Sequence, residues 1–200
     1  MTTDQIELQI RRVVENWAVW RDSGRWDALE NTWHSGGWMT ATWFDGPADA
    51  FVAASRIAWE RGLNVTHFLG GSAIEISGKR AIVHTRVSIT QRTIFQGQQI
   101  DVICTGRFVD MFSNPNGAWK IDRRQACYEN DRIAPVVPGP PFDFDDGLLG
   151  SFPIGYRHLG YIQTLAGLTV RRDLPGRQGP TYDELMSRCQ DWLERASRQA

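Results

Sequence analysis

The chain has 200 residues, with 22 basic and 23 acidic side chains and a formal net charge of −1. This length suits one domain with an extension and is ample for a sizeable core. The balanced charge, without a dense run of lysine or arginine, argues against nucleic acids and anionic membranes as partners. No signal-peptide pattern is evident, and no apolar run approaches the roughly 20 residues of a membrane span.

Tryptophan and cysteine usage narrow the class further. Seven of the nine tryptophans lie between Trp17 and Trp59. Such rings either fill a core or line a pocket for a flat apolar ligand, and Trp17 and Trp38 are the candidate substrate contacts. The three cysteines are widely spaced and form no CxxC pair and no disulfide framework, which favours a reducing, cytoplasmic compartment.

Helical patterns come first along the chain. Apolar residues repeat at three- and four-residue spacing over residues 6–17, which predicts an amphipathic helix that Gly24 ends. A short second helix is expected over residues 26–33, and a strand over residues 38–44. The alanine-rich segment 48–61 predicts a third helix.

Strand patterns dominate the middle of the chain. Five segments have β character: residues 65–69, 72–77, 80–95, 99–112 and 118–130. We interpret Gly70-Gly71 as a turn between the first two segments and Gln96-Gly97-Gln98 as the turn of a long hairpin. Helices followed by a long antiparallel sheet predict an α+β fold.

The composition changes again near the C-terminus. Residues 135–155 contain five prolines together with several large apolar side chains, which predict an irregular strap packed on the domain or on a neighbouring subunit. Residues 181–198 predict a terminal helix with Thr181 as the N-cap residue of a capping box. The expected organisation is therefore a domain over residues 1–135, followed by a strap and helix over residues 136–200.

The candidate catalytic residues are Asp22, His67 and Arg124. Histidine titrates near neutral pH and serves as a general base when a carboxylate fixes its tautomer, a role open to Asp22. Each also has a structural interpretation, Asp22 as a helix-end residue and His67 as a strand histidine bonded to backbone. Period-two alternation places Arg124 and Tyr128 on one face, opposite Ile121. Arg124 either stabilises a developing anion or faces solvent, and Tyr128 either donates a hydrogen bond into the site or packs in the core.

Several other kinds of site lack support in the sequence. No two histidines have the HxH or HxxxH spacing of metal ligands, so no metal is expected. A GxSxG nucleophile elbow, a phosphate-binding loop and a dinucleotide fingerprint are also missing from the sequence. Ser/His/Asp hydrolysis and nucleotide chemistry therefore lose their usual support.

Three segments, in this order and spacing, carry a family resemblance: Trp20–Leu29, Val65–Leu69 and Gly117–Ile121. Over about residues 5–135 the chain resembles SnoaL-like proteins of the nuclear transport factor 2-like superfamily. The resemblance implies a cone-shaped α+β barrel, in which a curved antiparallel sheet surrounds an apolar pocket and N-terminal helices close it. It also implies a homo-oligomer, a trimer in particular.

Within that superfamily the pattern is similar to the branch of scytalone dehydratase, hexachlorocyclohexane dehydrochlorinase and bile-acid dehydratase. This similarity implies that Asp22 and His67 form a proton-abstracting dyad that needs no cofactor, and that Arg124 assists the leaving group. The dehydrochlorinase has a lysine five residues before the aspartate, where this chain has Trp17. The apolar ring argues against assistance to a departing halide and favours an aromatic substrate.

The combined prediction is a cofactor-independent lyase that acts on an aromatic or polycyclic alcohol. The reaction is either dehydration or carbon–carbon cleavage with release of formaldehyde, as in the diarylpropane lyases of the superfamily. The alternatives are a non-catalytic ligand-binding or dioxygenase small-subunit-like barrel, and an isomerase or cyclase in the same pocket. Fold alone does not choose among them.

Overall fold

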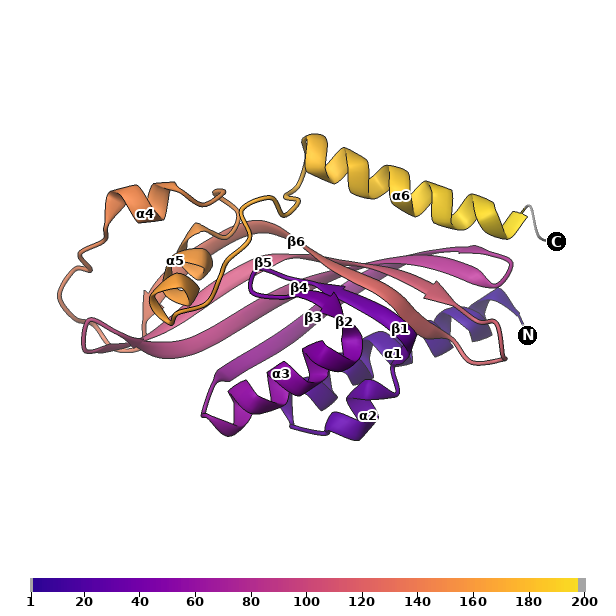
Figure 1. Ribbon diagram of the computed structural model, residues 1–200, viewed down its shortest axis with the longest axis horizontal. Helices are drawn as coiled ribbons and strands as arrows, with labels where there is room; N and C mark the ends of the chain where they lie inside the picture. The colour runs from indigo at the N-terminus through magenta and orange to yellow at the C-terminus, as the bar shows by residue number, and fades with distance from the viewer. Residues whose placement is uncertain (1, 198–200) are drawn as a thin grey trace.

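The structure of the protein is a computed structural model that describes residues 2–197, and side chains as far as residue 194. Within this range three helices lie in the N-terminal third: α1 (Thr3–Asp22), α2 (Trp26–Glu30) and α3 (Ala48–Glu60). Three more lie near the C-terminus: α4 (Asp146–Gly150), α5 (Arg157–Leu165) and α6 (Pro180–Ser197). The strands are β1 (Trp33–Thr40), β2 (Asp45–Pro47), β3 (Asn64–Ser77), β4 (Arg80–Phe95), β5 (Gln98–Ser113) and β6 (Lys120–Pro135). The predicted α+β class is confirmed (Figure 1).

The strands form one curved sheet in the order β2-β1-β6-β5-β4-β3 (Figure 1). Neighbouring strands are antiparallel, except that β1 runs parallel to β6. In the described part of the chain β2 and β3 are the two edges, so the sheet curves without closing. The cone-shaped barrel expected from the resemblance is therefore an open sheet whose concave side is covered by helices.

Of the two turns predicted between strand segments, the structure contains one. Gln96 (φ 48°) and Gly97 (φ 77°) both have positive φ, as a two-residue hairpin turn requires. This confirms the hairpin predicted there. Gly70-Gly71, in contrast, is not a turn, because β3 continues through it and pairs with β4 on both sides. The register shifts between Leu69 and Ser72, so the glycines form an irregularity within one strand.

Three local predictions are corrected by the structure. The second helix ends at Glu30, and Trp33 instead begins β1 and pairs with Ile121 of β6. A register shift in the β5–β6 pairing places Ile121 in the same buried cluster as Tyr128, although their spacing predicts opposite faces. Helix α6 begins at Pro180, so Thr181 lies inside its first turn and is not the N-cap residue.

Helices cover both faces of the sheet (Figure 1). The main core lies on the concave face, where α1 packs on β3 and α3 packs on β1. On the opposite face α6 packs on β3 and β4, and a smaller apolar cluster fills the contact. None of the described helices has the combination of length and apolarity that a membrane crossing requires.

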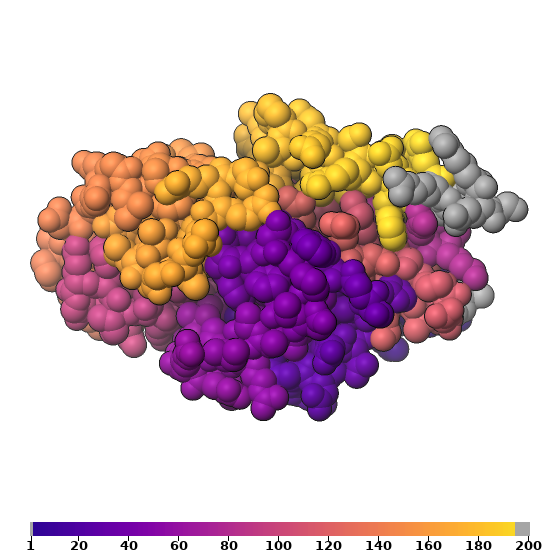
Figure 2. Space-filling view, viewed as in Figure 1, coloured from indigo at the N-terminus to yellow at the C-terminus, as the bar shows by residue number. Residues whose placement is uncertain are grey.

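The segment between β6 and α6 packs on the sheet of its own chain. Phe142 and Phe144 each pack against Phe95 at the end of β4, with ring centroids 5.5 Å apart. Farther along, the Arg171 backbone N–H donates to the Thr42 carbonyl at 2.9 Å. Figure 2 shows this segment, in orange, directly against the indigo-to-magenta N-terminal layer. The segment therefore completes the wall of the concave face.

Candidate functional site

The carboxylate of Asp22, the last residue of α1, reaches across to His67 on β3. Its Oδ1 accepts a hydrogen bond from His67 Nδ1 at 2.8 Å, and its Oδ2 accepts one from the His67 backbone N–H at 2.6 Å. One carboxylate therefore fixes both the imidazole ring and the strand that carries it. Because an ionised carboxylate only accepts hydrogen bonds, Nδ1 carries the proton and Nε2 keeps its lone pair. Among the described residues, no group hydrogen-bonds to Nε2.

Aromatic side chains hold the His67 ring on two sides. Trp17 from α1 meets it edge-on, with ring centroids 5.5 Å apart and planes at 82°. Phe108 from β5 lies 6.0 Å away at 38°. The His67 side chain is only 7% exposed, and Asp22 is 18% exposed. This packing restricts the ring to one orientation, which suits a positioned base.

The surroundings favour the neutral form of His67. Burial lowers the pKa of His67, the hydrogen bond and charge of Asp22 oppose that shift in part, and the positive charges of Arg21 and Arg124 lower the pKa further. A histidine with a lowered pKa is unprotonated at neutral pH and able to accept a proton.

Arg21 is a residue of this site that sequence reasoning missed. Its Nη1 lies 3.6 Å from Asp22 Oδ1, and its side chain is 5% exposed. Burial lowers the pKa of Arg21, with Asp22 acting in the opposite direction, but an arginine stays charged. The available signal was its position beside Asp22 in the last turn of a helix that ends against the sheet.

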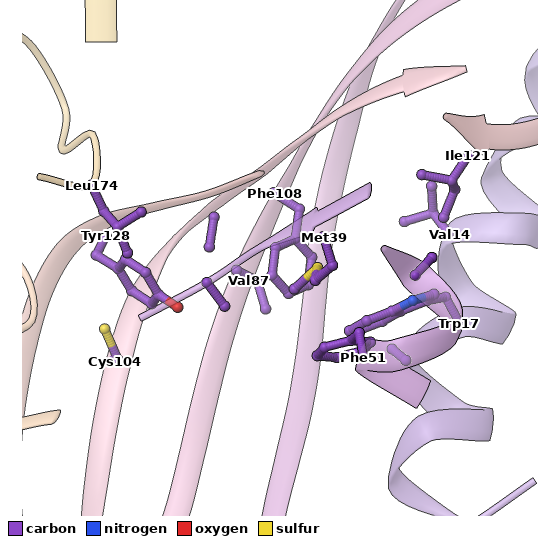
Figure 3. Close-up of a cluster of buried hydrophobic side chains, with 14 of the residues drawn as sticks. Val14, Trp17, Met39, Phe51, Val87, Cys104, Phe108, Ile121, Tyr128 and Leu174 are labelled. Atoms are coloured by element: carbon purple, nitrogen blue, oxygen red, sulfur yellow. The ribbon is translucent and has the colours of Figure 1, made fainter. Parts of the chain in front are cut away.

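His67 borders a cavity of about 340 Å³ between the helical layer and the concave face of the sheet. This volume lies at the lower end of the range of about 300–1,000 Å³ found for small-molecule sites. Its lining is mostly apolar and includes Met39, Trp43, Phe51, Ile89, Phe108 and Leu159. Figure 3 shows Trp17 and Tyr128 at opposite ends of the buried cluster, with Met39 and Phe108 between them.

Two of the three predicted substrate contacts line this cavity, and the third does not. Trp17 and Tyr128 are lining residues. Trp38 lies on the other face of β1, because adjacent strand residues alternate and its neighbour Met39 occupies the cavity side. There its Nε1 donates to Asp45 Oδ1 at 2.8 Å. The structure thus places Trp38 outside the cavity that His67 borders.

Arg124 also lies away from the cavity lining, in a buried ion pair. Its Nε and Nη2 each donate to a carboxylate oxygen of Asp110 at 2.7 Å, and both side chains are 0% exposed. The guanidinium lies 4.2 Å from the centre of the Trp17 ring and 4.5 Å from that of Phe108. Arg124 therefore supports the two rings that hold His67, and it reaches the imidazole through its charge rather than by contact.

Within residues 2–197 no group of three or more histidine, cysteine, aspartate or glutamate side chains lies close enough to hold a metal ion. The three cysteines are buried free thiols, and burial raises the pKa of each of them. Such thiols do not serve as reactive nucleophiles.

Comparison with known proteins identifies the family. A model of the SnoaL-like domain matches residues 5–125. The chain belongs to the SnoaL-like family. Pea pathogenicity protein 2 of Fusarium vanettenii is 33% identical to it over 198 residues, a match that covers 94% of this chain and 85% of that protein.

Solved structures share the SnoaL-like fold with this chain. A candidate scytalone dehydratase from Novosphingobium aromaticivorans superposes with a TM-score of 0.57 and 18% identity, over 71% of this chain and 97% of that one. A type 2 hexachlorocyclohexane dehydrochlorinase superposes with a TM-score of 0.55 and 15% identity, over 70% and 95%. The predicted family resemblance is confirmed, and at these identities the likeness shows a common fold.

Proposed function

We propose that this SnoaL-like protein is a cofactor-independent lyase that removes water from a small, largely apolar aromatic alcohol. The observation that carries the proposal is the position of His67. Its neutral ring is oriented by Asp22 and borders an apolar cavity of about 340 Å³. A base with this environment is suited to take a proton from a carbon acid that the cavity holds.

The proposed reaction balances without a co-reactant. His67 Nε2 removes a proton from the carbon next to the one that bears the hydroxyl group. The electron pair of that C–H bond forms a C=C bond while the C–O bond breaks. The imidazolium then returns its proton to the departing hydroxyl oxygen, so the products are an alkene and water. Asp22 stabilises the imidazolium between these two proton transfers.

Other residues support this chemistry without exchanging protons. Burial raises the pKa of the Tyr128 hydroxyl, which therefore stays protonated and able to donate a hydrogen bond to a substrate oxygen. Arg124 acts as a positioning residue, because it packs on Trp17 and Phe108 and its charge lowers the pKa of His67. The catalytic contact expected for Arg124 is replaced by this role in our proposal.

The test is turnover by chelator-treated protein on a panel of aryl and diaryl alcohols, with absorbance reporting the new conjugated double bond. We expect His67→Ala to lower kcat by about 10²–10⁴, the usual contribution of a positioned base. His158→Ala is the matched control, because His158 Nδ1 also pairs with a carboxylate, Asp131 at 3.0 Å, but is not a cavity-lining residue. Its turnover should equal that of the wild type.

The same assay separates the alternatives. Wild-type turnover by His67→Ala would overturn the mechanism. Formaldehyde among the products would assign carbon–carbon cleavage instead of dehydration, and a product with the mass of the substrate would assign an isomerase or cyclase. Binding without turnover of any compound would assign a ligand-binding protein.

A further inference from the structure

We propose that the end of the cavity remote from His67 is a second binding site, built by Gln163 and Thr42 for an uncharged oxygen group of the ligand. This inference rests on the proposed function in one respect, namely that the ligand of the second site is the substrate. The site itself follows from buried polar atoms. It would make the substrate a mostly apolar molecule with one oxygen group at the base and a second one at the far end.

The cavity lining has buried polar atoms without a partner at two places: Trp17 Nε1, beside His67, and Gln163 Oε1. Gln163 is 5% exposed and Thr42 is 1% exposed, and both line the cavity. Among the described residues, Gln163 Oε1 has no hydrogen-bond partner, whereas Thr42 Oγ1 has the Tyr128 hydroxyl beside it. Buried polar groups in folded proteins are almost always hydrogen-bonded, so the unpaired Gln163 Oε1 on this cavity indicates a ligand group that pairs with it.

Thr42 lies beside Tyr128, and Gln163 comes from a helix that contacts the strand of Tyr128. Thr42 interacts with the Tyr128 hydroxyl, and in Figure 3 Tyr128 lies at the opposite end of the cluster from Trp17, the neighbour of His67. Gln163 lies on α5, which packs on β5 and β6. Tyr128 belongs to β6. The second site is therefore separated from the base by the apolar middle of the cavity.

The side chains at the Tyr128 end of the cavity favour an uncharged oxygen group on the ligand. Gln163 and Thr42 are uncharged, and burial raises the pKa of Tyr128 so that its hydroxyl stays neutral. An amide and two hydroxyls offer both donors and acceptors, which matches a hydroxyl or carbonyl group. A neutral oxygen group can pair with these side chains without the cost of burying a charge.

The position of Gln163 along the chain also bears on specificity. The SnoaL-like domain match ends at residue 125, whereas α5 spans Arg157–Leu165. The dyad residues lie inside that match and Gln163 lies outside it. The segment after β6 thus adds a recognition group to a cavity whose base belongs to the shared domain.

The test measures binding of naphthalene and 2-naphthol by calorimetry to wild type, Gln163→Leu, Thr42→Val and His67→Ala. These probes share a ring system and differ by one hydroxyl group. We expect wild type to bind 2-naphthol more tightly by about two- to ten-fold, as one neutral hydrogen bond allows. Gln163→Leu and Thr42→Val should reduce this ratio toward one, while their unchanged affinity for naphthalene shows that the cavity is intact.

His67→Ala distinguishes the two ends. It should keep the preference for 2-naphthol, because its substitution alters the base and leaves the second site in place. Loss of the preference in His67→Ala, its survival in both Gln163→Leu and Thr42→Val, or equal or undetectable binding of both probes by wild type would overturn the second site. Turnover does not enter this measurement, so failure of the lyase proposal leaves these results interpretable.

Discussion

Breaking the buried pair of Arg124 and Asp110 should destabilise the protein far more than removing the pair altogether. Both side chains are 0% exposed and joined by two 2.7 Å hydrogen bonds. Arg124→Met leaves an unpaired buried carboxylate, and Asp110→Leu leaves an unpaired buried guanidinium. Each single change should cost about 3–5 kcal/mol. Domains are stable by about 5–15 kcal/mol, so this is a large share of the total.

The double variant should recover most of that loss. With both charges removed, apolar side chains replace a desolvated ion pair, a change that is often neutral or stabilising. At about 2–4 °C per kcal/mol for a chain of this size, each single variant should melt about 6–20 °C below the wild type. Urea unfolding followed by circular dichroism measures the three variants as one double-mutant cycle.

The exposed pair of Arg92 and Asp101 is the matched control. It has the same two-bond geometry, at 2.7 and 2.8 Å, but Arg92 is 43% exposed. Arg92→Met should have a much smaller effect, because solvent screens the charges. If Asp110→Leu cost no more than Arg92→Met, or if the double variant were as unstable as the worse single variant, the reasoning about desolvation would be refuted.

Four further predictions test the site and the assembly. Asp22→Asn should lower kcat by about 10²–10⁴, measured on the alcohol panel, because an amide stabilises the imidazolium poorly. The acidic limb of the pH profile of kcat/KM should have its midpoint below 6.5, because the environment lowers the pKa of His67 and activity is lost only when the ring protonates. A midpoint above 6.5 would contradict this environment. Gly155→Ala should lower the free energy of unfolding by about 1–3 kcal/mol, and thermal unfolding should show a lower melting temperature. The reason is overpacking, because a Cβ there would lie 2.2 Å from the Tyr128 carbonyl oxygen. Light scattering should give a mass three times that of the 22.7 kDa chain, as the family resemblance predicts.

Local patterns predicted the elements that local physics determines. The apolar spacing over residues 6–17 predicted α1, and Gln96-Gly97 predicted the hairpin turn. In both, the interactions that stabilise the element lie within a few residues of sequence. The candidate dyad came from resemblance instead, because Asp22 and His67 are 45 positions apart and only the fold brings them together.

Side-chain direction was harder to predict, because it depends on register. Trp38 and Met39 both suit a cavity, and strand parity alone decides which of them faces it. The bulge after Ile121 reverses the face assigned to that residue, and its sequence carries no glycine to signal the irregularity. Gln163 was missed because α5 follows the proline-rich segment 135–155, and the sequence patterns predicted no element between that segment and the terminal helix.

In the proposed function, chemistry and recognition are separated along the chain. Asp22 and His67 lie on α1 and β3, where a short helix-to-strand contact fixes the base regardless of what fills the far end of the cavity. Gln163 comes from a segment held by its own contacts with the sheet and the N-terminal layer. Changes in that segment would alter which molecules fit without moving the imidazole. Because a rate depends on both the base and the position of the substrate, such a division lets one fold retain its proton-transfer machinery while its substrate changes.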